Sequence, residues 1–197
     1  MSFGFARCVK EVRTVLKKAQ EKEILIFAAM ANHGIYANAA WPADTAADAI
    51  GIHSCEELGK SSSAFTPQPV DDNRNFMVIG EGITAHQLTA KGGGFRTVEG
   101  TSFATPVAVS MAAMILSFVN QARSQDIRRM YEENGLDLKD LKSTLGMRNI
   151  LREISKQSGR YSWIDPQLLW RGYLSMKDEP WGMREEGWRV ICTALSS

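Results

Sequence analysis

The sequence predicts an α/β fold, with a three-layer, mostly parallel, doubly wound sheet and flanking helices. Short, continuous apolar runs near residues 24–29, 48–52 and 76–79 are typical of strands buried on both faces of a parallel sheet. Helical periodicity occupies residues 8–20 and 101–120. We expect the three strands to be parallel and the two helices to cover opposite faces of the sheet.

The first element is an amphipathic helix in "ARCVKEVRTVLKKAQ", with charged residues opposite one apolar stripe. The stripe consists of Val9, Val12, Val15, Leu16 and Ala19. The strands follow in "ILIFAAM", "AADAIGIH" and "NFMVIG", and loops rich in proline, glycine and aspartate separate them.

The long helix from Thr101 to about Arg123 carries small residues that let it pass close to a sheet. These are Ala104, Ala108, Ala112 and Ala113. Pro106 fits a helix only in the first turn, which places Ser102 at the helix N-terminus. Beyond this helix, short amphipathic helices are expected, with stops at Gly135 and near Gly159. Residues 170–197 form a tail, rich in Trp, whose structure the pattern does not predict.

Composition excludes several classes of protein. The 197 residues, 44% of them hydrophobic, suit one domain or one domain with an appendage. A net charge of +1, from 23 basic and 22 acidic residues, predicts no nucleic-acid partner and no membrane partner. Cys8, Cys55 and Cys192 show neither disulfide nor metal-ligand spacing, and no secretory signal is recognisable. We therefore expect a cytoplasmic or otherwise intracellular protein.

Ser102 stands where unpaired backbone N–H groups and the helix dipole would stabilise an oxyanion. A simpler interpretation is that Thr101 or Ser102 only caps the helix. The wider pattern "GTSFATP" closely resembles the nucleophile motif of subtilisin-like serine proteases. The resemblance implies that Ser102 is the nucleophile, and that Gly100 and Thr101 belong to the substrate-binding site.

Two upstream segments resemble the same family. "ILIFAAMANHG" is similar to the strand and loop that carry the oxyanion-hole asparagine, which would be Asn32, with Ala31 in place of the usual glycine. Without that resemblance, the Asn-His-Gly stretch would be a simple turn. "MSFGF" resembles the strand whose backbone pairs with the bound peptide, which implies that Ser2, Phe3 and Gly4 line the substrate cleft.

The resemblance covers residues 1–169, as the C-terminal half of a subtilisin-like peptidase domain similar to intracellular fungal members. The family's triad aspartate and histidine lie in motifs that this chain does not match, so we expect the N-terminal part of the fold to be missing. His33, His53 and His86 fall in segments that align elsewhere, and each is expected to be a surface or turn residue.

The resemblance implies a serine-type endopeptidase acting on peptide or protein substrates. Without the triad aspartate and histidine, this chain alone is expected to be inactive. The alternative is a non-catalytic remnant, or a pseudoprotease domain that only binds peptides. No cofactor is implied, and the sequence leaves calcium binding and the oligomeric state open.

Overall fold

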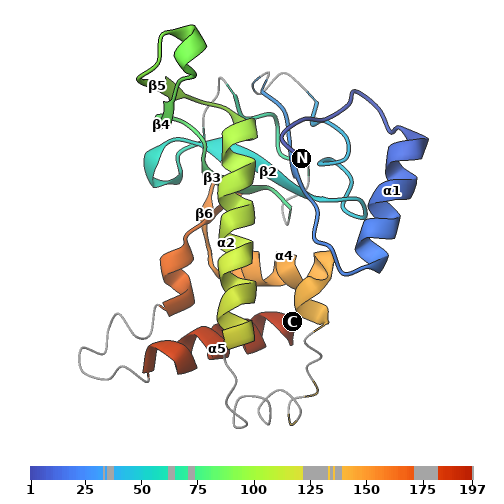
Figure 1. The fold of residues 1–197 in the computed structure, drawn as a ribbon. Helices are drawn as coiled ribbons and strands as arrows, with labels where there is room; N and C mark the ends of the chain where they lie inside the picture. Colours follow the sequence, from blue (N-terminus) through green and yellow to red (C-terminus); the bar gives the residue numbers. More distant parts are fainter. Residues whose placement is uncertain are drawn as a thin grey trace.

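A computed structural model describes residues 1–196, except residues 33, 35–37, 62–64, 71–73, 122–132, 134, 136–138 and 171–181. Its centre is a five-stranded sheet in the order β1-β2-β3-β7-β6, and a separate pair, β4 and β5, projects from one end (Figure 1). The strands are β1 (Phe27–Ala29), β2 (Ile50–Cys55), β3 (Phe76–Ile79), β4 (Ile83–His86), β5 (Phe95–Val98), β6 (Ser155–Ser158) and β7 (Tyr161–Ile164).

The three strands expected from the apolar runs are present and parallel. Phe27 pairs with Ile50, and Ile52 with Phe76, so β1, β2 and β3 run in the same direction. β7 also runs parallel to β3, and β6 closes that side as an antiparallel edge strand. The mostly parallel α/β sheet is therefore confirmed.

The prediction that helices extend to a stop near Gly159 is wrong for the residues just before that glycine. The helix α4 (Thr144–Glu153) forms as expected, but the next residues make the hairpin of β6 and β7 instead of more helix. Gly159 has a φ of 60°, and it supplies the left-handed conformation of the hairpin turn rather than a helix stop. The polar edge strand β6 lacks an apolar run of its own, so no strand signal preceded the turn.

The described residues form four α-helices around the sheet. They are α1 (Lys10–Glu21), α2 (Thr101–Gln121), α4 and α5 (Gly182–Leu195). Alternate residues of the first strand separate the two faces: Phe27 packs in the cluster that contains α2, whereas Ile26 and Ala28 pack with Leu16 of α1. The expected placement of α1 and α2 on opposite faces is confirmed.

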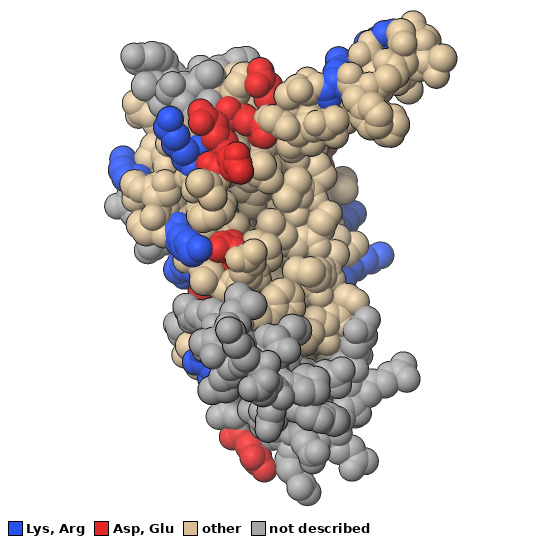
Figure 2. Space-filling view, turned by 90° about the vertical axis from the view of Figure 1, so that its left-hand side faces the viewer, with Lys and Arg blue, Asp and Glu red and all other residues tan. Residues whose placement is uncertain are grey.

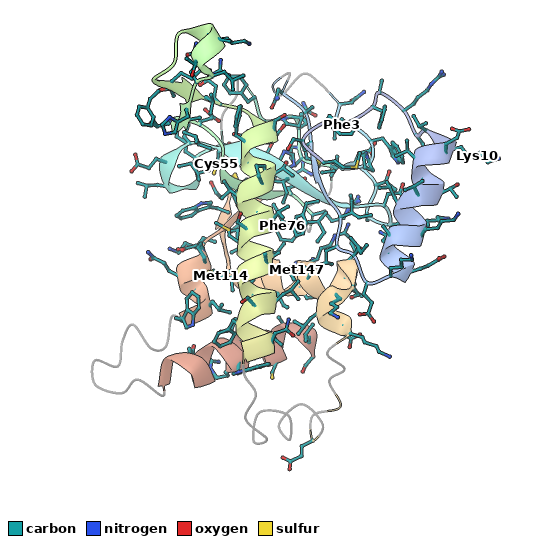
Figure 3. The ribbon with its side chains drawn as sticks, in the orientation of Figure 1. Phe3, Lys10, Cys55, Phe76, Met114 and Met147 are labelled. Atoms are coloured by element: carbon teal, nitrogen blue, oxygen red, sulfur yellow. The ribbon has the colours of Figure 1, made fainter. Side chains whose placement is uncertain are left out.

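α2 lies across the middle of the sheet, in front of Phe76 (Figure 3). Ala104, Ala108 and Ala112 are at most 2% exposed, and their small side chains bring the helix close to the strands. Pro106 stands in the second turn of α2 and not in the first, where it removes the hydrogen bond that residue 106 would donate to the Ser102 carbonyl. By length and composition, Thr101–Asn120 could also cross a membrane, although a third of this stretch is buried here.

The C-terminal helix is part of the same core. α5 packs on α4 and on the far end of α2 through a group of buried residues. These are Trp188, Val190, Ile191 and Ala194. At the other end of the molecule, α1 is held by the fully buried Asp48, which accepts hydrogen bonds from Arg13 Nε at 3.0 Å and Trp41 Nε1 at 2.9 Å.

Candidate active site

Ser102 is the second residue of α2, and it lies at the carboxyl end of the parallel strands. The turn before the helix is tied to the end of β3, because the Gly100 N–H donates to the Gly80 carbonyl at 2.8 Å. Gly100 has a φ of 122°, which L-residues rarely adopt. A glycine is therefore needed where the chain turns from the β5 strand into the helix that presents Ser102.

Asn32 is joined directly to this turn. Its side-chain oxygen accepts hydrogen bonds from the Thr101 N–H at 2.7 Å and from the Thr101 hydroxyl at 2.8 Å. Both Thr101 groups are donors here, so the Asn32 amide turns its Oδ1 toward Thr101. Its Nδ2 points away from Thr101 and is left as a donor. The structure thus brings the predicted nucleophile and the predicted oxyanion donor together at one helix N-terminus.

Thr101 organises this contact in a way that the motif did not indicate. Its side chain is fully buried, and its hydroxyl lies 3.1 Å from the Ala31 carbonyl as well as 2.8 Å from Asn32. The residue therefore contacts Asn32 and its neighbour. No sequence signal short of the full motif distinguishes this arrangement from an ordinary helix cap.

The N-terminal segment lies against Ser102. The Ser102 hydroxyl donates to the Ser2 carbonyl at 2.8 Å, and Met1 is hydrogen-bonded to both Phe27 and Ala29 of β1. Gly4 has no room for a side chain, because an added Cβ would lie 2.6 Å from that of Ala40. Phe3 is 60% exposed beside the start of α2 (Figure 3). The segment predicted to line the cleft thus borders Ser102.

Neither described histidine is placed to take a proton from Ser102. In β2, Ile50 and Ile52 face α2, so His53 points to the opposite face, where its ring packs edge-on against Tyr161. His86 pairs with Phe95 in the projecting hairpin, about 10 Å further along the strand than the end nearest α2. His33 lies outside the described residues. The prediction that His53 is a surface or turn residue is wrong, because this side chain is fully buried in a strand.

Other reactive groups in the described part of the chain do not form a second centre. No group of three or more His, Cys, Asp or Glu side chains is arranged to hold a metal ion among the described residues. Burial, with smaller effects from Glu81 and Glu56, raises the pKa of the Cys55 thiol to about 12. That thiol is therefore protonated at neutral pH and is a poor nucleophile.

Comparison with known proteins supports one family. Residues 1–149 match the Peptidase_S8 subtilase family. The subtilisin-like protease het-Q2 of Podospora anserina is 42% identical over 165 residues, which are 82% of this chain and 44% of that protein. The chain thus spans less than half the length of this relative.

Solved structures agree on the fold. The patellamide maturation protease PatA matches with a TM-score of 0.61 at 18% identity, over 85% of this chain and 59% of PatA. The prenylagaramide maturation protease PagA matches with a TM-score of 0.60 at 17% identity, over 100% of this chain and 61% of PagA.

Proposed function

Because this chain belongs to the subtilase family of serine proteases, we propose that it is the C-terminal half of a subtilisin-like endopeptidase domain with Ser102 as its nucleophile. Proteases of this kind act on peptide or protein substrates. The observation that carries the proposal is the contact between Asn32 and Thr101, which sets an amide donor beside a serine at a helix N-terminus. A serine that only capped the helix would not require this donor.

In the proposed reaction, Ser102 Oγ attacks the carbonyl carbon of the scissile peptide bond while a base takes the hydroxyl proton. The negative charge that develops on the carbonyl oxygen is stabilised by Asn32 Nδ2 and by the Ser102 backbone N–H. The C–N bond then breaks, and the amine leaves with the proton from the base. Water, activated by the same base, hydrolyses the acyl-enzyme and restores the serine.

The base is the part that the described residues do not supply. The Ser102 hydroxyl donates to the Ser2 carbonyl, and a carbonyl oxygen does not take up a proton at neutral pH. We propose that a histidine and an aspartate from polypeptide outside this chain complete the triad. Residues 1–197 alone then have little or no peptidase activity.

The test uses a fluorophosphonate probe, which labels only an activated serine. The purified chain is treated alone, and also after mixing with the N-terminal part of the Podospora anserina relative, with Ser102→Ala as the control. We expect labelling only in the mixture, and none with Ser102→Ala. Strong Ser102-dependent labelling of the chain alone would show that it contains its own base, and would overturn the requirement for an outside triad.

A second candidate function, peptide binding without catalysis, is favoured by the hydrogen bond that occupies the Ser102 hydroxyl. It predicts no labelling of Ser102 under either condition. It also predicts that Ser102→Ala binds labelled peptides from a random library as tightly as the wild-type chain does. Ser102-dependent labelling in the mixture would exclude this alternative.

A further inference from the structure

The hairpin between the sheet and the nucleophile stands clear of the body of the protein (Figures 1 and 2). This arm, residues 82–98, contains β4, the short 3-10 helix η2 (Thr89–Lys91) and β5. A two-stranded hairpin alone is marginally stable in water, since it buries little apolar surface. An arm that projects in this way gains stability when another surface covers it.

The side chains of the arm are apolar and basic. Leu88 is 73% exposed and Phe95 is 68% exposed, with the His86 ring 4.2 Å from that of Phe95. Lys91 and Arg96 are its charged residues, since residues 82–98 include no Asp or Glu. Neither has a carboxylate partner among the described ion pairs. The arm therefore offers an apolar centre with positive charge.

A patch of the opposite character lies beside the base of the arm, where carboxylates gather in Figure 2. Four glutamates surround the carboxyl ends of β2 and β3, and we call them the acidic patch. They are Glu56, Glu57, Glu81 and Glu99. Glu56 and Glu81 both raise the pKa of the Cys55 thiol, so both carboxylates lie near it. Glu99 directly precedes Gly100, whose N–H donates to the Gly80 carbonyl at the end of β3. Lys60, just after the patch in sequence, offsets only part of this charge.

Leu58 stands out from the acidic patch. It is 80% exposed and has a φ of 61°, an unfavourable conformation for a leucine. The chain has little freedom to turn it inward, because the next residue, Gly59, lies against the Trp163 ring. Leu58, Leu88 and Phe95 are the three most exposed large apolar side chains in the described part of the chain. Two belong to the arm and one to the patch.

We propose that two copies of this chain associate through these surfaces, with the arm of each copy lying on the acidic patch of the other. Leu88 and Phe95 of one arm contact Leu58 of the other copy. Lys91 and Arg96 of the same arm lie opposite the glutamates of that copy. Because each chain carries both surfaces side by side, a two-fold axis makes the contact twice, which is the usual geometry of homodimers. This association is independent of the proposed catalysis.

Charge reversal tests the proposal by sedimentation velocity, at about 0.05 M and about 0.5 M salt. We expect the wild-type chain to be a dimer that weakens at high salt. K91E/R96E and E56K/E57K should each be monomeric, since both of their contacts would join like charges. An equimolar mixture of the two variants should recover the dimer, because each arm then meets a patch of opposite charge. Circular dichroism verifies that each variant is folded.

K17E/K18E, on the exposed face of α1, is the matched control and should remain dimeric. A monomeric wild-type chain at about 100 µM would overturn the proposal. So would a dimer that survives both reversals, or a mixture that stays monomeric. Fluorophosphonate labelling does not enter these measurements, so a failure here leaves the proposed function standing.

Discussion

Thr101 donates its backbone N–H to the side-chain oxygen of Asn32, 69 residues earlier in the chain, at 2.7 Å. With the hydroxyl of the same threonine at 2.8 Å, this contact determines which end of the amide faces the helix. The orientation of Asn32, the proposed oxyanion donor, is thus set by the residue that precedes Ser102.

Asn32→Asp separates the donor from the structural contact. An aspartate keeps an oxygen acceptor for Thr101, but replaces the Nδ2 donor with a negative oxygen. In the protease completed by its N-terminal part, we expect kcat to fall by at least about 100-fold, since one oxyanion-hole donor contributes about 100- to 1000-fold. The thermal midpoint should stay near that of the wild type. An unchanged kcat would show that Asn32 does not stabilise the oxyanion.

Asn32→Ala is the companion variant, because it removes the donor and the contact together. The rate loss should match that of Asn32→Asp, while the free energy of unfolding falls by about 1–3 kcal/mol as the buried Thr101 groups lose their acceptor. Urea unfolding measures this difference. Equal stability of the two variants would mean that the Asn32–Thr101 contact does not stabilise the fold.

Gly100→Ala should damage the same contact from the other side. An added Cβ would lie 3.0 Å from Asn32 Oδ1 and 3.1 Å from Nδ2, at a φ of 122°. We expect the free energy of unfolding to fall by about 1–3 kcal/mol, together with weaker fluorophosphonate labelling of the completed protease. Gly82→Ala is the control: its φ is 67° with nothing within 4 Å of the new Cβ, so labelling should be retained. Equal labelling of both variants contradicts the argument.

The sequence predicts the parallel strands and α2 because their signals are local. The runs near Phe27, Ile50 and Phe76 are apolar on both faces, and the alanine stripe of α2 shows which helix lies closest to the sheet. β6 and β7 were missed because β6 is a polar edge strand, whose pairing depends on a neighbour and not on its own composition.

In the site, too, the local pattern predicts which residues are present but not which distant residues they contact. The motif and its resemblance locate Ser102 and Asn32, and the structure joins them. The apolar run near residues 48–52 stops before His53, so the pattern did not show that β2 continues to Cys55 and buries this histidine. The role of Thr101 also depends on a residue 69 positions away, so nothing in the local pattern reveals it.

Asp48→Ala should be among the more destabilising substitutions outside the site. The carboxylate is fully buried and accepts from Arg13 and Trp41, so its removal leaves the indole N–H of Trp41 without an acceptor. We expect a loss of about 2–4 kcal/mol in urea unfolding. Glu23→Ala breaks an exposed ion pair with Lys142 and should cost less than about 1 kcal/mol. Equal losses would show that Asp48 contributes no more than a surface charge.

His53 should make the fold sensitive to acid. The His53 side chain is fully buried in the folded chain, and this burial lowers its pKa from 6.5 to about 4. The neighbouring Asn75 side chain raises the pKa of His53, but by less than burial lowers it. Neither ring nitrogen has a hydrogen-bond partner among the described residues. Between these two pH values the unfolded chain binds the proton and the folded chain does not.

The free energy of unfolding should therefore fall as the pH is lowered from about 6.5 to about 4, by about 3 kcal/mol from this group. His53→Phe and His53→Leu both remove the titration but fit differently against Tyr161. Urea unfolding at a series of pH values should show the same flattening for both, whatever their stability at pH 7. If both variants kept the wild-type slope, His53 would not be the acid-sensitive group.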